Sequence, residues 1–183
     1  MNDLILSNLD VNDVEMTGSL QGYRRPVLRQ TVFTTARTLS VQESGALILM
    51  DKNEATTITL PAITANDIGV TYTFVQTVVS DLLRKIVTAY DNDYLVGGVS
   101  NLFDAAGDTD VAVQFVSAGA TDTTIVLGDN DLANAGGGLG ANVTLTAVLT
   151  GNTESGGGAK LVWAVSGTKV AQALTDTGAA FFA

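Results

Sequence analysis

The strongest constraint on the fold is a stretch of short β-branched and aromatic runs that turn residues separate. The runs cover residues 38–41, 46–50, 56–60 and 70–76. Thr, Val, Ile, Tyr and Phe pack well on a pleated sheet, whereas the Gly, Asn and Asp residues between the runs favour bends. Residues 56–60 alternate Thr with Ile or Leu, so one face meets a core and the other meets water. This stretch predicts a compact antiparallel β unit with no catalytic signature.

The β pattern continues beyond residue 76 and predicts one all-β domain. Further strands are expected at residues 85–89, 111–117, 123–127, 143–150 and 160–166. Short helical turns are expected near residues 80–85 and 169–174, and glycine-rich connections at residues 97–98, 136–138 and 156–158. Many short strands at this spacing predict an antiparallel β-sandwich or jelly-roll-like barrel over residues 38–183. We see no convincing internal repeat and no second domain.

Residues 1–37 differ in composition and predict a partly extended N-terminal arm that docks onto a partner or subunit. For residues 1–22, a plain edge strand or a frayed terminus is the alternative. Of the nine basic residues in the chain, four lie in this arm: Arg24, Arg25, Arg29 and Arg37. Arginine forks bind carboxylates bidentately. These side chains therefore dock onto an acidic partner, pair with the chain's own Asp and Glu residues, or bind phosphate.

Composition narrows the range of functions. The chain has 183 residues and a formal net charge of −10, which repels nucleic acid. It has no cysteine and no histidine, which excludes disulfides, thiolate or histidine-ligated zinc, and Ser-His-Asp or Cys-His catalytic centres. No apolar run approaches the roughly 20 residues of a membrane-spanning helix. We expect a protein that is not an enzyme, carries no cofactor, and binds neither nucleic acid nor a membrane.

Closely spaced acids raise the question of calcium. Three Asp-x-Asp pairs occur in expected loops: Asp91/Asp93, Asp108/Asp110 and Asp129/Asp131. Ca²⁺ takes about six to eight oxygen ligands, and none of the pairs continues into an EF-hand loop. Asp is also an ordinary turn former. The prediction is therefore no metal site, with structural calcium at residues 128–131 as the alternative.

Three aromatic residues are candidates for a subunit interface. Trp163 lies in the apolar run LVWAV and is expected either in the core or buried between subunits. Phe181 and Phe182 would form an exposed apolar tip unless they pack on their own domain or on a neighbouring subunit.

The segment SGALILMDKNEATTITLPAITANDIGVTYTFV resembles a module of tailed-bacteriophage capsid decoration (cement) proteins. The matching positions are Ser44, Gly45, Asp51, Thr57, Ile58, Thr59, Leu60, Pro61, Gly69, Tyr72 and Phe74. The late segment GAKLVWAVSGT, with Trp163 before Gly167, is similar to the closing strand of the same proteins. The resemblance covers residues 38–167. Similar Thr-Ile-Thr-Leu-Pro pieces occur in fibres and spikes.

The resemblance implies an all-β homotrimer on the outer surface of the capsid. Its partner would be the major capsid protein, and it would bridge neighbouring capsomers and stabilise the expanded shell. Linked subunits that bind adjacent sites gain retention from multivalency. In this interpretation Arg24, Arg25 and Arg29 contribute to capsid docking.

Two other functions stay open at this point. The first is a phage tail-fibre, spike or receptor-binding module that recognises host surface glycans. The second is a calcium-dependent enzyme or adhesion domain of a bacterium.

Overall fold

The structure is a computed structural model whose described elements are β-strands and short 3-10 turns. It describes residues 26–30, 35–80, 82–90, 93–103, 111–116, 122–127, 138–150 and 160–171. The strands are β1 (Val27–Arg29), β2 (Ala36–Thr38), β3 (Ala46–Met50), β4 (Thr56–Thr59), β5 (Thr71–Gln76), β6 (Arg84–Val87), β7 (Tyr94–Phe103), β8 (Val111–Val116), β9 (Thr124–Val126), β10 (Asn142–Leu149) and β11 (Leu161–Ala171). The 3-10 turns are η2 (Val41–Glu43) and η3 (Ala65–Asp67). The prediction of an all-β protein is confirmed.

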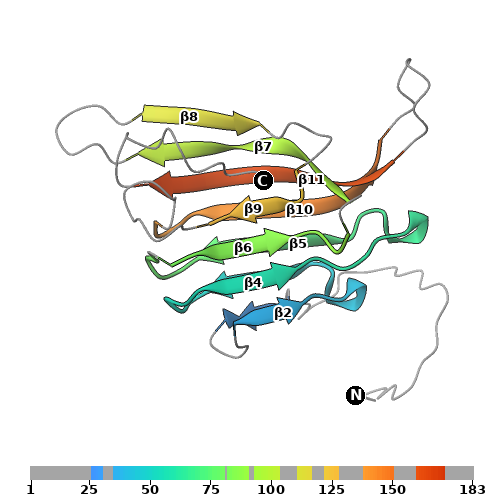
Figure 1. The fold of residues 1–183 in the computed structure, drawn as a ribbon, viewed down its shortest axis with the longest axis horizontal. Coiled ribbons are helices and arrows are strands. Elements are labelled where there is room, and N and C mark those ends of the chain that lie inside the picture. Colours follow the sequence, from blue (N-terminus) through green and yellow to red (C-terminus); the bar gives the residue numbers. More distant parts are fainter. Residues whose placement is uncertain are drawn as a thin grey trace, which may run out of the picture.

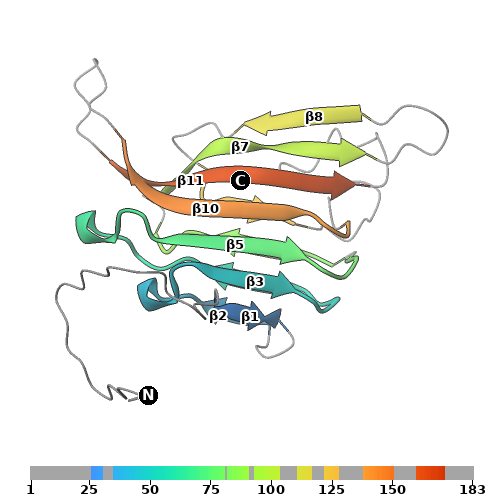
Figure 2. The same cartoon turned by 180° about the vertical axis from the view of Figure 1, so that it is seen from behind.

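The strands form two sheets that face each other (Figures 1 and 2). One sheet has seven strands in the order β1-β3-β5-β10-β11-β7-β8, and the other has four in the order β2-β4-β6-β9. The seven-stranded sheet therefore extends beyond the four-stranded one.

The first six strands alternate between the two sheets. Strands β1, β3 and β5 lie in the larger sheet, and β2, β4 and β6 lie in the smaller one. Each strand is parallel to the next strand of its own sheet, so β1 pairs with β3, β3 with β5, β2 with β4, and β4 with β6. The chain thus winds from layer to layer, and the strand in the opposite layer serves as the crossover that parallel neighbours require. We call β1–β6 the wound region.

The remaining strands close the two sheets with mainly antiparallel pairs. Strand β9 pairs antiparallel with β6, while β10 lies antiparallel between β5 and β11. Strand β7 runs parallel to β11 and antiparallel to β8. We call β7–β11 the closing region.

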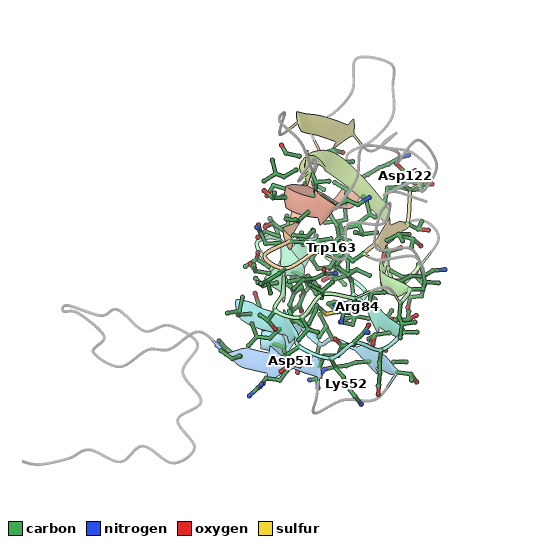
Figure 3. The ribbon with its side chains drawn as sticks, turned by 90° about the vertical axis from the view of Figure 1, so that its left-hand side faces the viewer. Asp51, Lys52, Arg84, Asp122 and Trp163 are labelled. Atoms are coloured by element: carbon green, nitrogen blue, oxygen red, sulfur yellow. The ribbon has the colours of Figure 1, made fainter. Side chains whose placement is uncertain are left out.

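Side-chain alternation explains why the layers face each other. Strands β3, β5 and β10 alternate strictly between buried and half-buried positions along most of their length. Because successive side chains point to opposite faces, the buried set of each strand lies between the layers, which Figure 3 shows filled with side chains. The core cluster contains Leu39, Ala46, Ile48, Met50, Ile58, Leu60, Tyr72, Phe74, Ile86, Leu95, Val99, Ile125, Leu127, Val143, Leu145, Ala147, Trp163 and Val165.

A repeated turn connects the layers along one side of the wound region. Before β3, the Glu43 carboxylate accepts hydrogen bonds from the backbone N–H and the Oγ of Ser40 at 2.9 and 3.3 Å. Before β5, the Asp67 carboxylate accepts the same two bonds from Thr64, each at 2.7 Å. Each turn ends in a glycine of positive φ, Gly45 (83°) or Gly69 (93°). The expectation of no internal repeat is therefore wrong for this turn.

The expected antiparallel arrangement is wrong for five of the nine described strand pairs, which are parallel. The jelly-roll-like topology and the extended N-terminal arm are not confirmed. Residues 1–25 lie outside the described part of the chain, and β1 and β2, which fall within the predicted arm, are strands of the two sheets.

Several local predictions were also wrong. The strand predicted at residues 38–41 is wrong for residues 39–41, because β2 ends at Thr38 and η2 begins at Val41. Residues 97–98 are not a connection but lie inside β7, which was not predicted. The helical turns expected near residues 80–85 and 169–174 are not observed among the described residues. The first segment leads into β6, which begins at Arg84, and the second contains the end of β11, at Ala171.

Candidate functional site

Two of the four predicted docking arginines bind carboxylates of their own chain. The Nε of Arg29 donates to Asp51 Oδ2 at 2.6 Å, and Arg37 forms an ion pair with Glu43. The Arg29 side chain is still 59% exposed, whereas the Asp51 side chain is 7% exposed. Pairing with the chain's own acids, the alternative left open by the sequence, is therefore observed for Arg29 and Arg37. Arg24 and Arg25 lie outside the described residues.

Trp163 belongs to the core of a single chain. Its side chain on β11 is fully buried and packs against Tyr72 of β5, with ring centroids 5.9 Å apart and ring planes inclined by 43°. Figure 3 shows it between the two layers. Because no part of Trp163 is exposed, it offers no surface to a neighbouring subunit, and that part of the interface prediction is wrong. Phe181 and Phe182 lie outside the described residues.

We call one strand of each layer, together with the connection between them, a coil of the wound region. A buried polar network links successive coils on the side of this region opposite the repeated turn. Gln30, which follows β1 and is 1% exposed, accepts a hydrogen bond from the Lys52 N–H at 3.4 Å. Its Nε2 donates to the Glu54 carbonyl at 3.4 Å and to Thr56 Oγ1 at 2.5 Å. One coil thus satisfies polar groups of the next, as a wound chain requires.

The fully buried Arg84 belongs to the same network. Its Nη2 donates to the Lys52 carbonyl, while Nε and Nη1 have no hydrogen-bond partner in the described chain. Burial lowers the pKa of Arg84 to about 10, although the charge of Asp51 opposes this shift. Figure 3 shows Arg84 between the layers, with Asp51 and Lys52 nearer the end of the molecule formed by β1 and β2. These contacts give Arg84 a structural role inside the wound region.

A pocket lies where the wound and closing regions meet. Its volume is about 410 Å³, and the described residues that line it are Ile63, Asp93, Tyr94, Lys160 and Leu161. Ile63 comes from the connection between β4 and β5, whereas the other residues lie at the starts of β7 and β11. The parallel pairing of Tyr94 with Val162 brings these two strand starts together.

The pocket contains two opposite charges. The Oδ2 atom of Asp93 is buried and has no hydrogen-bond partner in the described chain, and burial raises the pKa of this carboxyl group despite a hydrogen bond with the Tyr90 backbone. The ammonium group of Lys160 lies 5.5 Å from the centroid of the Tyr94 ring. A cation over an aromatic face is a favourable contact. One pocket is thus lined by an acidic, a basic, a phenolic and two aliphatic side chains.

The described residues do not assemble a metal centre. Within the described segments, no three acidic side chains lie close enough together to hold a metal ion. Of the six aspartates weighed for calcium, Asp93 alone lies within those segments, so calcium at residues 128–131 stays an untested alternative. Among the segments that the structure covers, no helix has the length and hydropathy of a membrane span.

Comparison with models of known protein families, with curated protein sequences and with solved structures found no match.

Sequence reasoning named Asp93, although as a calcium candidate, and missed the other pocket residues. Tyr94 begins a strand that the glycine pair at residues 97–98 concealed. Ile63 and Lys160 are almost a hundred residues apart, and no local pattern links them. The Asp-Tyr step at the start of an apolar run was a usable signal for β7, but nothing in the sequence indicated the pocket.

Proposed function

We propose that this chain is a structural virion protein that decorates the outer surface of a bacteriophage capsid. In this proposal the two layers act as a β-sandwich, and residues 1–37 dock it onto the major capsid protein. As a homotrimer, it bridges neighbouring capsomers and stabilises the expanded shell. The function is mechanical and requires no catalytic group or cofactor.

The residues that carry the resemblance to decoration proteins have structural roles in the fold, which supports a mechanical function. Its glycines, Gly45 and Gly69, occupy the positive-φ positions of the repeated turn. Its apolar residues Ile58, Tyr72 and Phe74 are buried in the core. Ser44 Oγ accepts a hydrogen bond from the Thr71 N–H at 3.1 Å, which joins two coils. These motif residues thus build the wound region, as expected of a scaffold.

The observation that carries the proposal is that both sheets end together at β1 and β2. Among the described residues, each of these strands has a hydrogen-bonded neighbour on one side only. The open edge of a strand is a template for pairing with another protein chain. Arg24 and Arg25 come shortly before β1 in the sequence, so a concentration of positive charge precedes an edge strand along the chain. This combination suits docking onto an acidic protein surface.

Trimerisation would make modest contacts sufficient. Once one subunit is docked, its partners reach the neighbouring capsid sites at high effective concentration. We therefore expect light scattering to give a native mass of three times the chain mass of 18.9 kDa.

The test is co-sedimentation of the purified chain with heads of the phage that encodes it, before and after expansion. The wild-type chain is expected to bind expanded heads. The variant R24E/R25E/R29E is expected to lose binding, because it reverses the positive charge that the proposal assigns to docking. Lys85→Glu is the matched control, since Lys85 lies on β6, away from β1 and β2, and should bind as the wild type does.

Circular dichroism separates docking from folding. Because Arg29 also pairs with Asp51, the double variant R24E/R25E is measured alongside the triple variant. Full binding by both charge-reversed variants would refute docking through the arginines. Failure of the wild-type chain to bind either form of the head would refute the decoration role itself. The alternative role in glycan recognition gains support from one described feature, the pocket beside Asp93.

A further inference from the structure

We infer that the pocket formed by Ile63, Asp93, Tyr94, Lys160 and Leu161 binds a neutral saccharide unit. This site is independent of the proposed capsid docking, because its described lining contains none of the docking arginines and no residue of β1 or β2. Its volume of about 410 Å³ falls within the ordinary range of small-molecule pockets.

The carboxylate of Asp93 defines the first requirement on the ligand. The N–H of Asp93 donates to the Tyr90 carbonyl at 3.0 Å, which fixes the backbone at this position. Its buried Oδ2 has no donor in the described chain. A buried acceptor without a donor is costly, and a ligand that donates a hydrogen bond removes that cost. Because Asp93 lines the pocket, a ligand that carries a hydrogen-bond donor suits this carboxylate.

The charges of the pocket argue against an ionic ligand. A cationic ligand would meet Lys160, whose ammonium group already occupies a position over the Tyr94 ring. An anionic ligand would meet Asp93 and the formal net charge of −10 of the whole chain. A ligand with a net charge of either sign therefore meets a like charge, which favours an occupant without net charge.

A saccharide supplies the remaining features. Each sugar hydroxyl is both a donor and an acceptor, so one hydroxyl can donate to Asp93 while another accepts from Lys160. The C–H face of a sugar ring is apolar and suits the side chains of Ile63 and Leu161. The pocket thus offers a partner to both the polar and the apolar parts of a sugar.

The experiment is saturation-transfer NMR of the full chain with separate probes. The neutral probes are glucose, galactose, mannose, rhamnose and N-acetylglucosamine, and the ionic probes are N-acetyl-lysine methylamide and inorganic phosphate. We expect at least one neutral sugar to give a saturable signal. Asp93→Ala should weaken its binding by about tenfold or more, since a hydrogen bond to a charged group is lost. Lys160→Ala should weaken it by a smaller factor.

The chain offers a matched control. Tyr90 is 64% exposed, lies four positions before Tyr94 and does not line the pocket. Tyr94→Ala should reduce the sugar signal, whereas Tyr90→Ala should leave it unchanged. Lys160 is exposed, so its variant is expected to fold even if Asp93→Ala does not.

Three outcomes would overturn the inference. The first is the absence of a signal from all five sugars. The second is a sugar signal that survives in the folded Asp93→Ala, Tyr94→Ala and Lys160→Ala chains. The third is binding of the ionic probes in preference to the sugars.

Discussion

The wound region and the closing region are both built from β-strands, but they differ in the direction in which neighbouring strands pair. In the wound region all four described strand pairs are parallel, and consecutive strands lie in different layers. In the closing region four of the five pairs that involve β7–β11 are antiparallel. The wound region therefore gains its order from repeated turns, and the closing region from long strands in register.

Glycines show the difference most clearly. Gly45 and Gly69 in the wound region have positive φ angles, and a Cβ at either position would meet nothing within 4 Å. Gly97 and Gly167 in the closing region also have positive φ angles, but a Cβ there would overlap a backbone carbonyl oxygen of a neighbouring strand. The first pair serves turn geometry, and the second pair serves the close approach of strands.

The largest expected effect comes from Gly97→Ala and Gly167→Ala. Each is expected to lower the free energy of unfolding by more than about 4 kcal/mol, since strand backbone must move to admit the Cβ. Gly45→Ala and Gly69→Ala are expected to cost only roughly 1–2 kcal/mol each, the penalty of left-handed backbone for a residue with a Cβ. Urea titration followed by circular dichroism measures all four. Equal losses in the two pairs would contradict the distinction between turn and strand glycines.

Trp163→Ala tests whether the two regions are one cooperative unit. Trp163 of β11 packs on Tyr72 of β5, so its removal leaves a cavity between the closing and wound regions. A loss of about 3–5 kcal/mol is expected for a buried aromatic residue. Tyr72→Phe, which removes only the hydrogen bond from the Tyr72 hydroxyl to the Ser40 carbonyl, should cost about 1 kcal/mol.

Amide hydrogen exchange locates the Trp163 effect. In the Trp163→Ala chain, protection is expected to fall in β3 and β5 as well as in β10 and β11. Wild-type protection of β3 and β5 in that variant would show that the wound region is stable without the closing region.

The smallest expected effect concerns the carboxylates of the repeated turn. Burial raises the pKa of Glu43, but hydrogen bonds from Ser40 and Arg37 outweigh it, so the pKa lies below its ordinary value of 4.5. Hydrogen bonds from Thr64 lower the pKa of Asp67 from 3.8. A carboxylate with a lowered pKa stabilises the fold above its ordinary pKa and loses that contribution as pH falls through the lowered value.

The corresponding variants are Glu43→Gln and Asp67→Asn. Each should make the free energy of unfolding less dependent on pH below about pH 4.5, because each variant removes a carboxylate whose pKa is lowered in the folded state. Urea titrations at a series of pH values measure this dependence. An acid dependence as steep as that of the wild type in both variants would contradict the role of the turns.

Local patterns predicted the strands better than they predicted their partners. The bounds of β3 were predicted correctly because its five residues are apolar and turn residues flank them. Strand β7 was missed because Gly97 and Gly98 resemble a connection, although the lack of a Cβ at Gly97 permits close strand approach. Trp163 was correctly placed among core candidates from its apolar run.

The direction of pairing was not predictable in the same way. A short run of turn residues between two strands suggests an antiparallel hairpin within one sheet. Here the residues between Met50 and Thr56 carry the chain into the opposite layer. Their backbone carbonyl groups accept hydrogen bonds from Gln30 and Arg84, which belong to other coils. The pocket depends on the same long-range arrangement, so its residues could not be grouped from sequence.

The most direct test of the parallel winding uses the absence of cysteine from the natural chain. In the structure Thr57 of β4 lies opposite Lys85 of β6, with Ile58 opposite Ile86. An antiparallel pair centred on the same two isoleucines would instead place Thr57 opposite Val87. Directly opposed cysteines are close enough for a disulfide, whereas positions two residues out of register are not.

The measurement is the extent of intramolecular disulfide formation, by mass spectrometry, in the variants T57C/K85C and T57C/V87C under mild oxidation. Parallel winding predicts a disulfide in T57C/K85C and free thiols in T57C/V87C. A disulfide in T57C/V87C and none in T57C/K85C would contradict it.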